Sequence, residues 1–153
     1  MDKLVDMPIK EGLLDLDNQL CFALYSASLA MNKLYRKILK PLGITYSQYL
    51  VLLILWKQDE LSVTDIGEKL FLDSATLTPL LKRMESANLI ERRRSEHDER
   101  HVIISLSLEG KALKEKANEI PYDVLCHTNC DKETLLEMKE NLESLRSNIL
   151  SRL

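Results

Sequence analysis

Glycine, proline and cysteine are scarce in this sequence, at 4, 4 and 3 of 153 residues. So few turn-forming residues exclude a fold of many short strands, and helices should dominate. Three cysteines are also too few for the disulfide framework of a small secreted protein. They indicate free thiols in a reducing compartment.

Long hydrophobic runs are absent as well. The longest, LVLLILW at residues 50–56, is far shorter than the roughly 20 residues that a transmembrane helix needs. The opening residues, MDKLVDMPIKEG, mix acids with bases and lack the continuous apolar segment of a signal peptide. We therefore expect a soluble, cytoplasmic protein without a membrane partner.

The sequence has no excess of positive charge. Its formal net charge is −3 and its isoelectric point is about 5.7, which excludes a uniformly basic nucleic-acid binder but allows a local basic patch. With 45% hydrophobic residues, the chain can form one compact domain or one subunit of an oligomer.

Apolar residues at alternating steps of four and three predict a long helix over residues 15–39. This heptad-like stripe suits an interface between helices, and it consists of Leu20, Leu24, Ala27, Met31, Leu34 and Ile38. The helix should end at Lys-Pro-Leu-Gly, residues 40–43, because proline and glycine both oppose its continuation.

The middle of the chain predicts a helix-turn-helix. Thr45 and Gln48 have the spacing of a capping box, and the helix that they open carries the long apolar run. A buried strand is the alternative for that run, but the cap and the length favour a helix. A short helix over residues 62–70, a turn, and a second helix capped by Asp73 and ending near Ala87 complete the pattern.

A charged hairpin should follow. Residues 89–93 and 102–106 are strand-like, and the polar stretch between them forms the tip of a wing. After the wing we expect a helix over residues 107–120, stopped by Pro121, and a last amphipathic helix from Asp131 to about Leu150.

The predicted fold is therefore mainly α with a small β-hairpin wing, a winged helix-turn-helix. Residues 45–106 form the DNA-binding domain, residues 1–44 an N-terminal dimerisation helix, and residues 107–153 the C-terminal dimerisation helices. A helix of 25 residues cannot bury both faces against so small a domain, so the terminal helices of two chains should interleave in a homodimer.

The outer face of the helix after Asp73 is the candidate DNA-reading surface. Small side chains, several with hydroxyl groups, allow close approach to DNA bases and phosphates, and two basic residues further along the helix supply positive charge. The residues are Ser74, Ala75, Thr76, Thr78, Lys82 and Arg83. Pro79 removes one helical hydrogen bond on this surface. It indicates a functional surface, or simply a helix that begins at Thr76.

Asp98 and Arg100 lie on one side of the predicted hairpin, two residues apart. Asp98 could brace Arg100 so that its guanidinium enters a narrow minor groove. The alternative is an ordinary surface ion pair. Acids and bases nearly balance over residues 74–101, so the electrostatic argument for DNA binding is weak by itself. That argument needs the arginines to lie at the wing and the acids to turn away.

The segment SVTDIGEKLFLDSATLTPLLKRMESANLIERRRSEHDERHVIISLSLEGK resembles the MarR family of dimeric winged-helix regulators. Asp98-Glu99-Arg100 matches the wing motif of that family, and LSLEGK matches the opening of the helix after the wing. The likeness covers nearly the whole chain. It implies that the recognition helix enters the major groove of a palindromic operator, that Arg100 enters the minor groove, and that the protein is not an enzyme.

The segment LCFALYSASLAMNKLYRKILKPLGITYSQYLVL resembles the organic-hydroperoxide-resistance regulators within that family. The likeness implies that Cys21 senses the peroxide and that Tyr35 and Tyr46 hold its thiolate. Tyr25 lies one turn after Cys21 on the same helix face. Tyr35 follows Cys21 by 14 residues, about 21 Å along a helix. Only the helix of a partner chain can therefore bring Tyr35 to Cys21.

By the same likeness, the chain is of a two-cysteine type in which a second cysteine resolves the oxidised sensor. Cys126 matches the position of that cysteine, and Cys130 is the spare. Peroxide would convert Cys21 to a sulfenic acid, and Cys126 of the other subunit would form a disulfide with it. The resulting movement of the dimer helices would change the spacing of the recognition helices and release the DNA.

Other interpretations remain open on the residues alone. A cysteine on an apolar helix is most often a core residue, and tyrosines near a dimer seam most often serve packing. Cys126, His127 and Cys130 could bind zinc, but a second matched pair is missing. A regulator released by a small aromatic ligand is the main alternative. A thiol peroxidase is disfavoured, because an enzyme has no need of a winged helix. We expect no cofactor and no metal.

Overall fold

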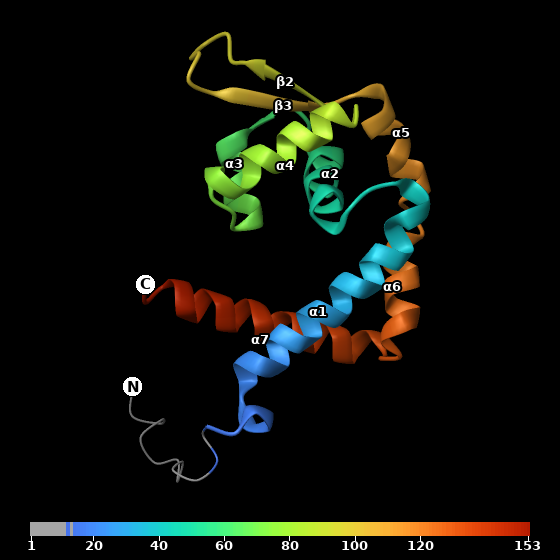
Figure 1. Cartoon of the computed structure of the whole chain (residues 1–153), viewed down its shortest axis with the longest axis vertical. Coiled ribbons are helices and arrows are strands. Elements are labelled where there is room, and N and C mark those ends of the chain that lie inside the picture. Colours follow the sequence, from blue (N-terminus) through green and yellow to red (C-terminus); the bar gives the residue numbers. More distant parts are fainter. Residues whose placement is uncertain (1–11, 13) are drawn as a thin grey trace.

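The computed structural model describes residue 12 and residues 14–153. Within these residues the chain forms seven α-helices and three short strands (Figure 1), so the predicted class, mainly α with a small wing, is confirmed. The elements are α1 (Leu20–Leu39), α2 (Tyr46–Lys57), β1 (Leu61–Ser62), α3 (Val63–Leu70), α4 (Ser74–Ser86), β2 (Ile90–Arg94), β3 (Val102–Leu106), α5 (Leu108–Lys116), α6 (Ile120–Thr128) and α7 (Lys132–Leu150), with 3-10 turns at Leu16–Asn18 and Lys40–Leu42.

The predicted helix starts of the winged domain are confirmed. The Thr45 hydroxyl accepts a hydrogen bond from the Gln48 amide at 3.3 Å, and the Gln48 side chain accepts one from the Thr45 amide at 3.0 Å. Ser62 and Asp65 form a second capping box at α3. The Asp73 carboxylate accepts from the Thr76 amide at 2.8 Å and opens α4. Local side-chain chemistry therefore fixes each start.

The core lies where α2, α3 and α4 meet the sheet. It is formed by side chains with almost no exposure, among them Leu52, Leu55, Ile66, Leu77, Leu81, Met84, Ile90 and Ile104. The strands are antiparallel in the order β1-β3-β2, with Ile90 opposite Leu106 and Arg94 opposite Val102. The short strand β1, which pairs Leu61 with Ile104, was not predicted.

Gly110 fixes how α5 leaves the wing. A Cβ at this position would overlap the carbonyl oxygen of Leu89. The Ser107 hydroxyl donates to the Asn88 carbonyl at 2.6 Å, and the Trp56 indole N–H donates to the Gly110 carbonyl at 2.8 Å. The base of the wing, the start of α5 and the end of α2 are thus joined at one tight crossing.

Two predicted boundaries are wrong. The first helix begins at Leu20 rather than near Asp15, because a 3-10 turn precedes it. The helix predicted over residues 107–120 ends at Lys116. Pro121 then lies in the first turn of the unpredicted helix α6, where a missing backbone N–H costs little. Cys126 is therefore on a helix.

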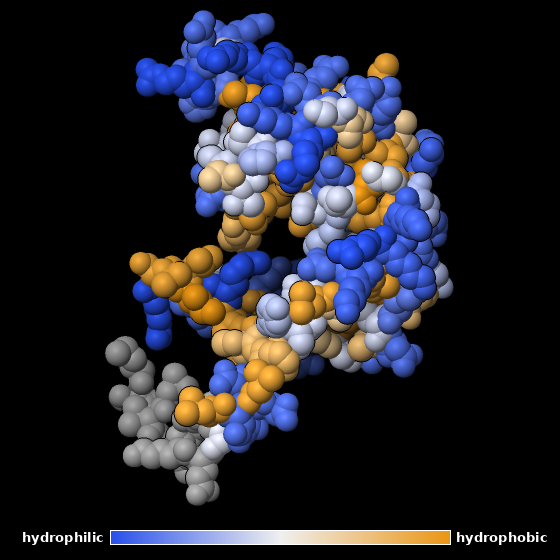
Figure 2. Space-filling model, viewed as in Figure 1, coloured by the Kyte–Doolittle hydropathy of each residue, from blue (hydrophilic) through white to orange (hydrophobic). Residues whose placement is uncertain are grey.

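The terminal helices carry apolar faces that residue 12 and residues 14–153 leave exposed. No residue of α7 is buried, and Figure 2 shows apolar side chains gathered at its C-terminal end and along the lower part of α1. The exposed large apolar residues include Leu20, Leu29 and Met31 of α1 and Leu136, Met138, Leu142, Ile149 and Leu150 of α7. Exposed apolar surface on this scale is typical of an interface between chains.

Among the described residues, no single helix has the length and apolar character required to cross a membrane; the bent pair Leu20–Leu42 and Tyr46–Lys57 meets that test only when its two parts are taken together.

Candidate DNA-binding surface and thiol site

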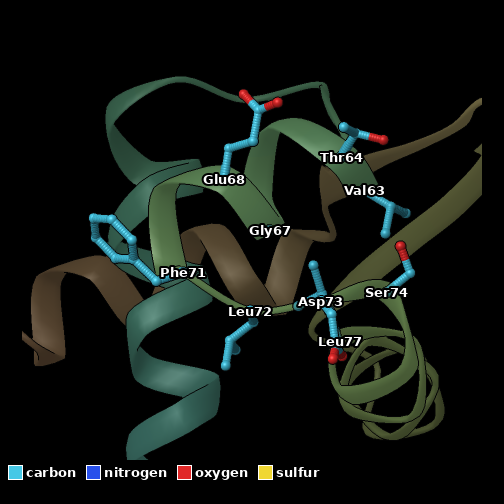
Figure 3. Close-up of a pocket in the computed structure, with 9 residues that line it drawn as sticks. All are labelled: Val63, Thr64, Gly67, Glu68, Phe71, Leu72, Asp73, Ser74 and Leu77. Atoms are coloured by element: carbon cyan, nitrogen blue, oxygen red, sulfur yellow. The ribbon is translucent and has the colours of Figure 1, made fainter. Parts of the chain in front are cut away.

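α3 and the start of α4 pass each other closely at Gly67, where a Cβ would press on the Leu72 carbonyl oxygen and touch Leu77. Figure 3 shows the small hollow that remains between Thr64 and Glu68 of α3 and Ser74 of α4. Phe71 ends α3 with a left-handed backbone, φ 57°. The two helices therefore form the tight helix-turn-helix that the sequence predicted.

The predicted DNA-reading residues of α4 lie on its outer face. Ser74, Ala75, Thr76, Lys82 and Arg83 are exposed and Thr78 is half-buried, whereas Leu77, Leu80, Leu81 and Met84 face the core. α4 begins at Ser74, so Pro79 lies inside the helix, and the alternative start at Thr76 is wrong. Pro79 is exposed and cannot donate to the Ala75 carbonyl, which breaks the helical ladder on this outer surface.

The wing places Asp98 against Arg100, as the spacing predicted. The Arg100 amide donates to the Asp98 carboxylate at 3.0 Å, and the Arg100 Nε lies 3.7 Å from the same oxygen. The other carboxylate oxygen lies 3.5 Å from His101 Nε2. The Arg100 side chain is 93% exposed, so Asp98 orients a guanidinium that extends into solvent.

The expectation that the acids turn away from the wing arginines is wrong. Arg92 pairs with Glu85 at 2.7 Å, and Arg93 pairs with Glu60 at 2.6 Å. Both acids come from neighbouring elements, the end of α4 and the loop before β1, so the spacing along the wing could not reveal them. These pairs brace the base of the wing and reduce the positive charge there.

Cys21 is the second residue of α1 and is exposed in the protomer. The first turn of a helix has unpaired backbone N–H groups that favour negative charge. Tyr25 is exposed one turn later. Cys21 and Tyr35 lie in the same helix, α1, so their separation of 14 residues prevents contact within one chain.

Tyr35 and Tyr46 do come together, although nothing in their spacing along the chain required it. Their rings stack with centroids 4.2 Å apart, and Tyr49 lies 5.9 Å from Tyr35. Burial, with added repulsion from the Tyr46 and Tyr49 hydroxyls, raises the pKa of Tyr35 to about 12. Burial also raises the pKa of Tyr46. Both phenols therefore keep their protons near neutral pH and can donate hydrogen bonds.

A cavity of about 950 Å³ opens beside this tyrosine pair. Leu24 and Met31 of α1 form one wall, and the opposite wall comes from α7, including Leu142, Arg146 and Ile149. Neither Arg146 nor Tyr49 was predicted from the sequence. Tyr49 could have been found, because it lies one turn after Tyr46; Arg146 is near the tyrosines only through the fold.

The second cysteine is exposed on α6. Tyr122 lies one turn before Cys126, and a hydrogen bond with Cys126, followed by repulsion from the charges of Cys126 and nearby acids, raises the pKa of Tyr122. Cys130 is half-buried, and its thiol contacts the Thr128 carbonyl at 3.3 Å. All three cysteines are free thiols, and within the described residues no group of three potential ligands is arranged around a metal position.

Comparison with known proteins defines the class. Residues 33–120 match the family described as transcriptional regulator SarA/Rot. The organic hydroperoxide resistance transcriptional regulator of Bacillus subtilis is 52% identical over 130 residues, which are 85% of this chain and 88% of that protein.

Solved structures agree with this class. Reduced AbfR bound to DNA has a TM-score of 0.75 at 38% identity, over 88% of this chain and 94% of AbfR; a further structure of AbfR names Staphylococcus epidermidis as its source. Disulfide-formed AbfR has a TM-score of 0.60 at 39% identity, over 85% and 91% of the two chains. MarR of E. coli with operator DNA has a TM-score of 0.75 at 22% identity, over 87% of this chain and 97% of MarR. This likeness shows the fold.

The winged helix-turn-helix and these relatives define a transcriptional regulator that binds DNA, in a family whose members are dimers. The chain belongs to the MarR family of winged-helix transcriptional regulators and resembles its organic-hydroperoxide group.

Proposed function

We propose that the protein is a cytoplasmic, homodimeric repressor that releases operator DNA when an organic hydroperoxide oxidises Cys21. Residues 45–106 bind the DNA in this proposal, and residues 1–44 and 107–153 join the two chains. The observation that carries it is the exposed Cys21 at the start of α1, together with the stacked, protonated pair Tyr35 and Tyr46, which lie half-buried near the end of α1 and at the start of α2. In a dimer, the tyrosines of one chain can donate to the Cys21 thiolate of the other.

The chemistry takes two steps. The Cys21 thiolate attacks the terminal peroxide oxygen, the O–O bond breaks, and the alkoxide leaves as an alcohol after taking a proton. The thiolate of Cys126 in the other subunit then attacks the sulfenic sulfur, and hydroxide leaves as water. One peroxide is reduced, and two thiols become a disulfide.

Two observations support a change of shape at the second step. This structure has three free thiols, and its TM-score is 0.75 with reduced, DNA-bound AbfR but 0.60 with disulfide-formed AbfR. A disulfide also requires Cα atoms within about 7 Å of each other. We infer that closing the Cys21–Cys126 bond moves the helices of the dimer away from the arrangement that fits DNA.

Replacing each of the two candidate partner cysteines, Cys126 and Cys130, tests which of them pairs with Cys21. After cumene hydroperoxide treatment, the parent and Cys130→Ser should run as cross-linked dimers on a non-reducing gel. Cys126→Ser should stay monomeric on the gel and hold a sulfenic acid at Cys21 that dimedone traps and mass spectrometry detects, because its resolving thiol is missing. Cross-linking in Cys126→Ser, or its absence in the parent, would refute the proposed disulfide.

DNA contact is proposed for Ser74, Ala75, Thr76, Thr78, Lys82 and Arg83 on α4 and for the Asp98–Arg100 pair of the wing. Arg100→Ala should weaken binding about tenfold or more, because a well-placed arginine contributes about 1–3 kcal/mol. The measurement is fluorescence anisotropy with a duplex selected from randomised DNA by the parent protein.

Arg93→Ala is the matched control for Arg100. The Arg93 guanidinium lies in the same wing but is paired with Glu60. The DNA affinity of the Arg93→Ala variant should therefore stay within about twofold of the parent. Equal losses in the two variants would mean that the wing acts through general charge alone.

A regulator released by a small aromatic ligand is the alternative, and the cavity beside Tyr35 and Tyr46 favours it. It predicts that an aromatic acid releases DNA from a variant lacking Cys21, and that peroxide has no effect on the parent.

A further inference from the structure

Arg146 joins the last helix to the DNA-reading part of the same chain. Its guanidinium carbon lies 4.2 Å from the centre of the Phe71 ring. Arg146 belongs to α7, and Phe71 is the residue that ends α3. Figure 1 shows the C-terminal end of α7 lying below α3 and α4, and a guanidinium over a ring face is an attractive cation–π arrangement.

Phe71 has no evident role in its own surroundings. Its side chain is 59% exposed, so it contributes little to the core. Its backbone is left-handed, φ 57°, a conformation in which glycine or asparagine costs less than a bulky residue. In Figure 3 the ring projects away from Asp73 and Ser74 at the start of α4. The ring therefore needs an explanation outside the turn, and the contact with Arg146 supplies one.

Arg146 also borders the tyrosine site. It lines the same cavity as Tyr35 and Tyr46. On its own helix, Lys139 pairs with Glu143 at 2.9 Å; the hydrogen bond from Lys139, with further attraction from Lys139 and Arg146, holds the pKa of Glu143 below its usual value. The Arg146 side chain thus contacts the end of α3 and also lines the cavity that the tyrosine pair borders.

We propose that Arg146 is a positioning residue for DNA binding, whose stack on Phe71 fixes the helix-turn-helix against α7. α7 carries one of the uncovered apolar faces assigned to the dimer interface, so this contact ties the pose of each recognition helix to the dimer. Without the stack, the helix-turn-helix samples other poses, and only a fraction of dimers hold the spacing that the operator requires. The stack is also short-ranged, so a shift of α7 by a few ångströms removes it.

Operator affinity of matched variants in the presence of reductant tests this role. Arg146→Met keeps the length of the side chain but loses the charge, and Phe71→Leu keeps an apolar side chain but loses the ring face. Each should weaken binding about three- to fivefold, as expected for an exposed cation–π pair. The double variant should be no weaker than either single one, because both remove the same contact. Phe71→Tyr, which retains a ring face, should bind like the parent.

Two further readouts separate positioning from other roles. The thermal midpoint of each variant should match the parent, because both side chains are exposed. The slope of log affinity against log salt should also be unchanged in Arg146→Met, whereas loss of a direct phosphate contact would reduce that slope by about one. Parent-like affinity, additive losses in the double variant, or a reduced slope would overturn the proposal.

These measurements use reduced protein, so they stand even if the proposed peroxide sensing fails. Only a second arm rests on that proposed function: if peroxide releases the parent by moving α7, Arg146→Met should need less peroxide for half release. A parent that ignores peroxide would refute the sensing and leave the reduced-state result intact.

Discussion

Cys21→Ser should bind operator DNA as tightly as the parent and remain bound after an organic hydroperoxide is added. The serine hydroxyl has nearly the same size as the thiol but is not oxidised by peroxide. Cys21 is exposed and contributes no core packing within the protomer, so the fold and the DNA-binding surface should be unaffected. The expected effect is a complete loss of the response, measured by anisotropy before and after stoichiometric cumene hydroperoxide.

Cys130→Ser is the matched control for that experiment. It removes a thiol of the same chain that is half-buried and placed against the Thr128 carbonyl, and it should release DNA as the parent does. If Cys21→Ser still releases its DNA on peroxide treatment, the sensor is another residue and the proposed mechanism is wrong.

Gly110→Ala should destabilise the fold by about 3 kcal/mol, the upper end of the usual cost of overpacking. The added Cβ would overlap the Leu89 carbonyl oxygen and crowd Leu106. Backbone cannot yield as a flexible side chain does, so α5 must shift away from the wing and weaken the indole hydrogen bond from Trp56. Urea unfolding followed by circular dichroism measures the loss.

Gly43→Ala separates this crowding from a general effect of removing glycine. Gly43 has φ 67°, and no atom lies within 4 Å of the place that an added Cβ would take, so the substitution should cost only about 1 kcal/mol of left-handed strain. Similar losses in the two variants would show that the crossing at Gly110 is looser than the structure indicates.

The helix starts of the winged domain could be predicted because each depends on neighbours within three residues. Thr45 with Gln48 and Asp73 with Thr76 are local hydrogen bonds that the order of residues specifies directly. The sequence does not reveal α6, because Pro121 predicts the end of a helix, whereas a proline can end one helix and also fit the first turn of the next. The ion pair of Arg93 with Glu60 depends on how strands pair, so spacing along the wing gave no indication of it.

Part of the candidate site could be predicted from the sequence, and part could not. The likeness to a known family points to Tyr35 and Tyr46, whose rings are in contact in the structure; their role at the thiol stays a prediction. It gave no information on Tyr49 or Arg146, because their roles follow from how α2 and α7 pack. Cys21 lies at the start of α1, whereas Tyr35 lies near its end and Tyr46 at the start of α2, so in the proposed mechanism a second chain must bring Cys21 to the tyrosines.

Trp56, whose indole donates to the Gly110 carbonyl, ends a row of aromatic rings that has an optical consequence. Trp56 is the single tryptophan of the chain, and its ring centre lies 6.3 Å from that of Tyr49, which in turn lies 5.9 Å from Tyr35. At such separations light absorbed by the tyrosines is transferred efficiently to the indole. The emission of Trp56 excited through the tyrosines therefore depends on the distances between these rings, and it can be followed without any attached dye.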